Sequence, residues 1–121
     1  STLALASYFN IQRQVQFVDS RDLGVEGAGS ERVLNIVKVL GGTVYVTGHG
    51  ARNYLDHQQF VEAGIEVEYM NYICAPYQQP HGLFTPYVSA LDLIANCGQT
   101  GVNLLQSETL NWRDFLGKSN E

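Results

Sequence analysis

The sequence predicts an α/β fold: a single domain over residues 1–121, with a mainly parallel sheet of three to four strands, a βαβ unit and helices on both faces. A chain of this length holds one modest hydrophobic core. Its β-branched stretches alternate with segments of helical periodicity, the pattern of a sheet layered with helices. Glycine clusters separate these segments, and no repeat or linker interrupts them.

The first residues predict a helix and then a strand. Within Ser1–Asn10, the residues Leu3, Ala6 and Phe9 (or the one after it) recur every three to four positions, so they should face inward. Val15–Val18 is a short apolar run, which predicts a half-buried or fully buried strand.

A glycine-rich loop and a second helix come next. Asp19–Ser30 reads DSRDLGVEGAGS, and Ser30 is a suitable N-cap for a helix over Glu31–Leu40, which carries a broad apolar stripe. Gly41-Gly42 can end that helix in the left-handed conformation. Because Thr43–Thr47 is again β-branched, strand, loop, helix and strand make a βαβ unit with a parallel pair and a right-handed crossover.

The middle of the chain predicts another helix and strand. After a turn at Gly48–Gly50, Asp56 should cap a helix over His57–Ala63 that ends at Gly64. Ile65–Tyr69 alternates apolar and acidic residues, which indicates a strand with one wet face near a sheet edge.

The last third opens with a shaped loop. Proline and glycine residues punctuate Tyr77–Tyr87, which is therefore expected to be neither strand nor helix. Ser89 stands where the N-cap of an apolar helix ending at Gly98 belongs. A short helical piece around Val102–Leu105 and a final segment over Asn111–Leu116 follow.

Composition and charge exclude several function classes. The net charge is −5 and no basic run occurs, which argues against a duplex nucleic acid partner. No apolar run approaches the ~20 residues of a membrane helix, so a cytoplasmic protein is expected. Cys74 and Cys97 lack zinc-site spacing and could form a disulfide or remain packed free thiols. Neither a metal nor a cofactor is expected.

Two loops follow the predicted parallel strands: Asp19–Ser30 and Gly48–Asn53. Both should lie at the rim where open α/β sheets bind ligands. The helix start at Ser30 would suit an anion such as a phosphate or an anionic sugar. The glycine spacing matches neither a P-loop nor a dinucleotide fingerprint, so a plain strand-to-helix connection is the alternative.

Three side chains on that rim could carry chemistry. Asp22 could accept hydrogen bonds from sugar hydroxyls or act as a base, or it could be a turn residue that bonds its own backbone. His49 lies between two glycines and should be exposed, either at a site or incidentally. Arg52 could pair with a phosphate or carboxylate, or be a solvated loop charge.

A third cluster lies in the stretch Tyr77–Gly98. Gln79, His81 and Asn96 offer neutral hydrogen-bonding groups, and Asp92 is its carboxylate, on the same helix face as Asn96. Asp92 should either face solvent or be held by buried donors. In the second case its role would be to hold the preceding loop.

Four segments together resemble a known family in order and approximate spacing. They read SRDLGVEGAGSERV at Ser20–Val33, TVYVTGHGARNYLD at Thr43–Asp56, FVEAGIEVEY at Phe60–Tyr69 and YQQPHGLFTPYVSALDLIANCG at Tyr77–Gly98. The chain resembles the C-terminal half of the WbqC-like family, bacterial proteins named from a lipopolysaccharide O-antigen biosynthesis cluster. Thr47 and Gln78 stand where that family usually has Ser and Pro. The resemblance points to Ser20, Asp22, Gly48, Tyr54, Gln79, Ser89 and Asp92.

The resemblance implies a transferase-type role in surface polysaccharide (O-antigen) biosynthesis, with a nucleotide-linked or other anionic sugar as ligand. A non-catalytic partner-binding or homodimerisation module is the alternative. Asp22 and Asp92 are the predicted catalytic residues. The predicted ligand-binding residues are Ser20, Ser30, Gly48, His49, Arg52, Tyr54, Gln79 and Ser89.

Overall fold

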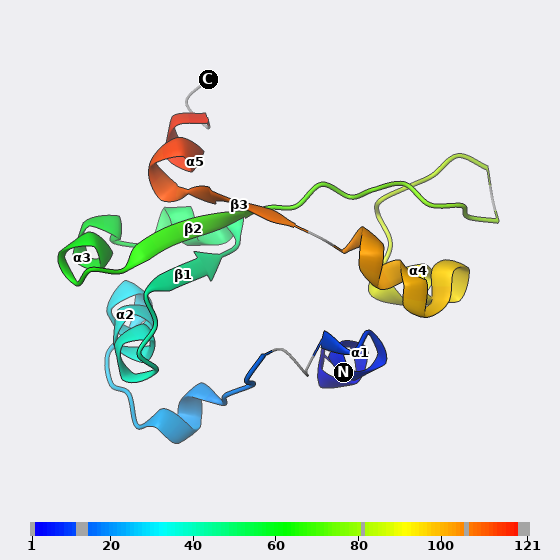
Figure 1. The fold of residues 1–121 in the computed structure, drawn as a ribbon. Coiled ribbons are helices and arrows are strands. Elements are labelled where there is room, and N and C mark those ends of the chain that lie inside the picture. Colours follow the sequence, from blue (N-terminus) through cyan, green and yellow to red (C-terminus); the bar gives the residue numbers. More distant parts are fainter. Residues whose placement is uncertain (1, 12–14, 81, 106, 119–121) are drawn as a thin grey trace. The chain divides into compact units, whose positions relative to one another are not determined.

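The computed structural model describes residues 2–11, 15–80, 82–105 and 107–118 as a mixed α/β arrangement (Figure 1). The chain divides into two compact units. Unit 1 comprises Ser1–Phe17 and Tyr72–Ser107, and unit 2 comprises Val18–Asn71 and Glu108–Glu121. Unit 2 holds the sheet, whereas the described regular structure of unit 1 is helical.

The sheet of unit 2 has three strands in the order β1-β2-β3 among the described residues. Strands β1 (Val44–Thr47) and β2 (Glu66–Asn71) are parallel, with Val44 opposite Glu66 and Thr47 opposite Tyr69. Strand β3 (Glu108–Asn111) is antiparallel to β2. The sheet is therefore mixed rather than mainly parallel, while its strand number agrees with the prediction.

Strand β2 lies in the centre of the sheet, so its expected place near an edge is wrong. Its wet face is present, because Glu66 is exposed and Glu68 half-buried, whereas Val67 is fully buried. Strand β3 covers the far edge of β2 and supplies partners for both acids. The Asn111 amide donates to Glu66 at 3.0 Å, and the Thr109 hydroxyl donates to Glu68 at 3.1 Å.

Val15–Val18 does not form the predicted strand. The side chains of Val15, Phe17 and Val18 are 50%, 49% and 40% exposed, so the run lacks the burial that would hold a strand. The parallel partner of β1 is β2 instead. The βαβ unit therefore lies one step later in the chain than predicted, with α3 (His57–Glu62) on the connection between the two strands.

Helix α2 (Gly29–Val39) starts before Ser30, which is therefore not its N-cap. Ala28 occupies that position without a side-chain hydrogen bond. The Ser30 hydroxyl instead accepts a hydrogen bond from the backbone N–H of Asp56 at 2.9 Å, which ties α2 to the start of α3. Gly41 has φ +70°, the left-handed conformation expected after the helix.

The N-cap predicted for α3 is confirmed, because the Asp56 carboxylate accepts from the backbone N–H of Gln59. Two 3-10 helices and a last α-helix complete the regular structure of unit 2. They are η2 (Ser20–Leu23), η3 (His49–Asn53) and α5 (Trp112–Lys118).

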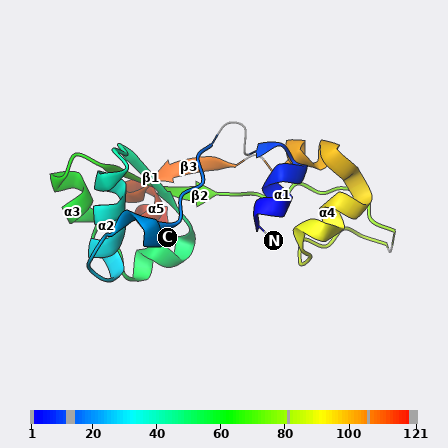
Figure 2. The same ribbon diagram turned by 90° about the horizontal axis from the view of Figure 1, so that it is seen from below.

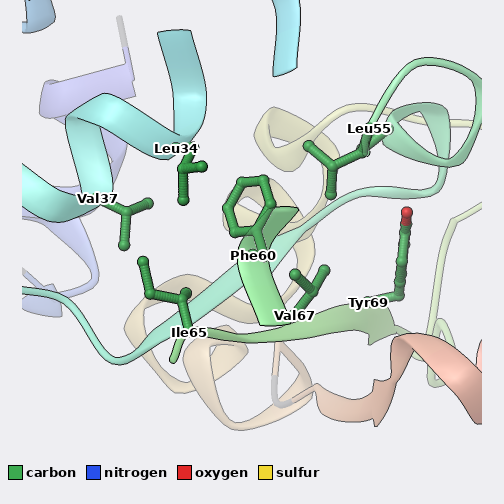
Figure 3. Close-up of a cluster of buried hydrophobic side chains, with 8 residues drawn as sticks. Leu34, Val37, Leu55, Phe60, Ile65, Val67 and Tyr69 are labelled. Carbon is green, nitrogen blue, oxygen red and sulfur yellow. The ribbon is translucent and has the colours of Figure 1, made fainter. Parts of the chain in front are cut away.

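The core of unit 2 lies on one face of the sheet (Figure 3). Phe60 of α3 lies among side chains of α2 and β2, and it is fully buried together with Val67 and Tyr69. Trp112 and Phe115 of α5 pack against the same cluster. Helices α2, α3 and α5 therefore lie on the same face of the sheet, whereas helices were expected on both faces. The opposite face of β2 carries the acidic side chains of Glu66 and Glu68.

Unit 1 contains α1 (Thr2–Tyr8), α4 (Ala90–Cys97) and η4 (Gly98–Leu104). Figures 1 and 2 both show α1 beside α4 within this unit, and the Gln99 amide donates to the Tyr8 carbonyl at 3.5 Å. Ala6 and Phe9 are buried as expected, but Leu3 is 63% exposed, so its predicted inward orientation is wrong.

The start of α4 follows the prediction, because the Ser89 hydroxyl accepts from the backbone N–H of Leu91 at 3.2 Å. Gly101 packs so closely against this helix that a Cβ atom there would lie 2.9 Å from Leu93. None of the described helices is long and apolar enough to cross a membrane.

Candidate functional site

The C-terminal ends of the parallel strands β1 and β2 bring several aromatic and polar side chains together in unit 2. Gly48 and His49 directly follow β1. The His49 Nε2 atom lies 2.7 Å from the accepting carbonyl oxygen of Met70, and the His49 ring centroid lies 4.9 Å from that of Phe115. His49 is exposed as expected, but its ring also links the loop after β1 to β2 and α5.

A histidine–tyrosine pair forms the centre of this region. The His57 Nε2 atom lies 2.7 Å from the hydroxyl oxygen of Tyr69. Tyr69 is fully buried and stacks on Phe115 with ring centroids 4.1 Å apart. His57 is half-buried and stacks on Trp112 with centroids 4.8 Å apart. The imidazole is thus fixed by one hydrogen bond and one stacking contact.

Burial sets the protonation of both rings. It lowers the pKa of His57, against the smaller opposing effect of the Asp56 charge. It also raises the pKa of Tyr69, an effect that Tyr45 and Tyr54 reinforce and the positive charge of Arg52 opposes. Near neutral pH the pair is therefore an uncharged imidazole and an uncharged phenol. With one ring nitrogen held by Tyr69, the other can exchange a proton with a bound group.

Arg52 and Tyr54 lie on the outside of this region. Both are exposed, and the positive charge of Arg52 opposes the rise in the pKa of Tyr69. Within the described part of the chain, Arg52 makes no ion pair, so its guanidinium can receive an anion. The one ion pair among the described residues of the unit is local: Arg21 binds Asp19 at 2.6 Å, with both side chains in solvent.

The glycine-rich loop Asp19–Ser30 is held by side chains of α2 rather than by a preceding strand. The Arg32 guanidinium donates to the Val25 carbonyl at 2.7 Å, and the Asn35 amide donates to the Glu26 carbonyl at 3.4 Å. Ser20 is half-buried and Asp22 is exposed, both on η2. The backbone N–H of Asp22 donates to the Asp19 carbonyl at 3.0 Å.

In unit 1, Asp92 is held by two donors from the preceding loop. The Tyr77 hydroxyl donates to Asp92 Oδ2 at 2.5 Å, and the Gln79 amide donates to the same atom at 2.9 Å. These hydrogen bonds, that from Tyr77 first, lower the pKa of Asp92. The bond to Asp92 likewise raises the pKa of Tyr77. Asp92 is therefore an ionised acceptor with its partners in place.

Gln79 uses both ends of its amide to shape the loop. Its nitrogen also donates to the Thr85 carbonyl at 3.2 Å, and its oxygen accepts from the Thr85 backbone N–H at 3.0 Å. Tyr77 packs edge-on against Phe84 with ring centroids 5.0 Å apart. Of the two arrangements considered for Asp92, the structure shows the held one, in which the carboxylate anchors this loop to α4.

The predicted site residues fall into two sets. Gln79, Ser89 and Asp92 belong to unit 1. The set in unit 2 comprises Ser20, Asp22, Ser30, Gly48, His49, Arg52 and Tyr54. His81 lies outside the described residues. Cys74 and Cys97 are both free thiols, so of the two alternatives the structure shows the unbridged one.

Sequence reasoning missed the importance of His57, Tyr69 and Trp112. The signal for Tyr69 was present, because the alternation in β2 directs it to the same face as Val67. Nothing in the sequence pairs it with His57, which lies twelve residues earlier. Among the described residues, no group of three or more histidine, cysteine or acidic side chains is arranged to hold a metal ion.

The model of the WbqC-like protein family matches residues 1–104. The chain belongs to this family. It is similar to the uncharacterized protein Rv1507c of Mycobacterium tuberculosis, with 34% identity over 104 residues, which are 85% of this chain and 44% of that protein. The chain thus spans less than half the length of this WbqC-like relative. No solved structure matches it.

Proposed function

We propose that this WbqC-like protein has a transferase-type role in bacterial surface polysaccharide (O-antigen) biosynthesis and binds a nucleotide-linked or other anionic sugar. The observation that carries the proposal is the oriented His57–Tyr69 pair at the C-terminal ends of the parallel strands, together with Arg52, whose positive charge acts on Tyr69 and which makes no ion pair among the described residues. Membership of the WbqC-like family supports the polysaccharide context.

Each side chain has a separate role in this proposal. Arg52 would bind the phosphate or carboxylate of the ligand, because a guanidinium forms paired hydrogen bonds to such groups. A transfer to a hydroxyl requires that the acceptor lose its proton, and the free ring nitrogen of His57 would take it. Tyr69 would be a positioning residue that fixes the imidazole. Asp22, exposed on η2, would accept hydrogen bonds from sugar hydroxyls or act as a second base.

The binding step can be tested by isothermal titration against a panel of nucleotide sugars, with this chain and with a longer WbqC-like protein. We expect Arg52→Ala to weaken binding by about tenfold or more, because it removes a charge-assisted contact. Arg21→Ala is the matched control, since Arg21 is already paired with Asp19 in solvent. Absence of binding by both proteins would overturn the proposal, as would equal effects of the two substitutions.

A second candidate function, a partner-binding or homodimerisation module, is favoured by the open face of the sheet. On the face opposite the core, Val44, Val46 and Met70 are 46%, 48% and 42% exposed. Parallel strands are normally covered on both faces. Strand β1 is also an edge strand, and its sequence VYVT lacks the Lys or Pro that commonly protects an edge.

Sedimentation velocity at several protein concentrations separates this candidate from the first. A module that pairs through the open face should show a mass that rises with concentration. A monomer over the whole range would speak against self-association through this face and leave the transferase-type proposal standing.

A further inference from the structure

A cavity of about 190 Å³ lies within unit 1. It is formed by the segment that follows β2, by the loop before α4, by the first half of α4 and by the end of η4. Six of its wall residues are Tyr72, Tyr77, Pro86, Leu93, Leu104 and Leu105. All of its wall residues belong to unit 1, so the cavity is a property of that unit alone.

The wall of this cavity is uncharged and almost wholly apolar. Among the residues that the structure describes, no acidic, basic or histidine side chain lines it. Two of its polar groups are already engaged: the Ser89 hydroxyl accepts from the Leu91 N–H, and the Tyr77 hydroxyl donates to Asp92. The cavity is partly open to solvent, and its described wall offers a bound molecule mainly apolar contacts.

The volume indicates the size of the ligand. An engineered apolar cavity of roughly 150 Å³ remains dry and binds benzene. The cavity of unit 1 is somewhat larger, at about 190 Å³. It can therefore hold one aromatic ring or a compact alkyl chain, whereas a charged group would lose its hydration inside and would have to remain at the open mouth of the cavity.

We propose that this cavity is a binding site for a small, uncharged apolar molecule, the size of one aromatic ring or a short alkyl chain. The site lies on residues of unit 1 only and does not depend on the anion site proposed in unit 2. Burial of apolar surface on Leu93, Leu104 and Leu105 provides the free energy of binding.

The two free thiols of unit 1 provide an internal comparison. Cys74 lines the cavity, whereas Cys97, the last residue of α4, does not. Both are half-buried. A small thiol reagent such as methyl methanethiolsulfonate, with mass spectrometry of each cysteine, therefore measures access to the cavity at Cys74 and general access at Cys97.

The probes are benzene and 1-hexanol, with hexanoate as the charged comparison. We expect the two neutral probes to slow modification of Cys74 in a saturable manner, about fivefold when the probe is at about four times its Kd, since only the free fraction reacts. Modification of Cys97 should not change, and hexanoate, whose carboxylate must remain at the open mouth, should protect Cys74 less than 1-hexanol at the same concentration. The result needs no transferase activity, so it can fail or succeed independently of the function proposed above.

A filled-cavity variant gives the second measurement. Ala90 is the half-buried first residue of α4 and lines the cavity, so Ala90→Phe should slow Cys74 modification and abolish further protection by benzene. Ala95→Phe is the matched control, because Ala95 is exposed on the same helix and outside the cavity wall. If Ala90→Phe does not fold, the proposal is still tested by whether the neutral probes slow modification of Cys74 and not of Cys97 in the unaltered chain.

Three outcomes would overturn the proposal. Equal protection of both cysteines would indicate nonspecific binding. Absence of protection of Cys74 at saturating benzene and 1-hexanol would show that neither enters. A Cys74 that is unreactive without any probe would show that the chain itself fills the cavity.

Discussion

At the scale of single residues, the two predicted catalytic carboxylates have different surroundings. Asp92 accepts from Tyr77 and Gln79, and through Gln79 it holds the backbone at Thr85. Asp22 is exposed, and its backbone N–H donates to the Asp19 carbonyl, an interaction that does not involve the carboxylate. The geometry therefore separates a carboxylate that anchors a loop from one that a ligand can reach.

Replacement of each carboxylate by its amide tests this division. Asp92→Asn should lower the thermal midpoint of unfolding by a few degrees, because the ionised acceptor of two hydrogen bonds is lost. Asp22→Asn should leave the midpoint unchanged and weaken sugar binding. Calorimetry and titration on both variants measure the two effects, and the reverse pattern would contradict the assignment.

His57 makes the stability of the protein depend on pH. Because burial lowers the pKa of His57 in the folded chain, the unfolded chain takes up the proton first as the pH falls. The free energy of unfolding should therefore decrease below a pH of about 6.5, the ordinary pKa of histidine, and continue to decrease until the folded His57 is protonated.

Urea unfolding at a series of pH values, on the unaltered chain and on His57→Gln, measures this dependence. The variant should be less sensitive to pH between neutral pH and the window in which Asp and Glu titrate. The matched control is His49→Gln, which removes the exposed histidine beside Phe115. An equally steep dependence in the His57→Gln variant would exclude His57 as the cause.

At the scale of elements, α3 contributes one buried side chain, Phe60, to the core of unit 2. Phe60 is fully buried and stacks on Tyr45 with ring centroids 5.6 Å apart. Phe60→Ala should lower the free energy of unfolding by about 3–5 kcal/mol, the range for removal of a buried aromatic ring. Val61→Ala, at the half-buried neighbouring position, should cost much less. Urea unfolding followed by far-UV circular dichroism measures both.

Local signals in the sequence were sufficient for several elements. The N-caps of α3 and α4 follow from Asp56 and Ser89, and the stop of α2 follows from Gly41. These features depend on neighbouring residues only, so the sequence contains the whole cause.

Long-range pairing could not be read in the same way. Glu108–Asn111 has the polar sequence ETLN and becomes a strand because β2 offers an edge and two glutamates. Val15–Val18 has the stronger strand pattern and is unpaired. The His57–Tyr69 pair depends on the same tertiary packing, so the sequence suggested a candidate site at the end of the sheet but gave no sign of this pair.

At the scale of the whole molecule, the described elements of unit 2 cover its sheet on one face only. Val46 lies on the open face and is 48% exposed. If the open face joins copies of the chain, Val46→Lys should abolish the rise of mass with concentration, because a charge would then be buried at the interface. Sedimentation velocity measures the mass. Lys38→Ala, at an exposed position on α2, is the control and should leave it unchanged.

The side-chain bonds between β2 and β3 have a consequence for how the strands align. A shift of one residue would reverse the faces of β3, which the core contacts of the following α5 oppose. A shift of two residues would keep every side chain on its face, so burial alone cannot prevent it. The pairs Glu66–Asn111 and Glu68–Thr109 would both be lost in such a slip. The hydrogen bonds of Glu66 and Glu68 therefore stabilise the observed alignment of β3 with β2 over the shifted alignments that would keep each side chain on the same face.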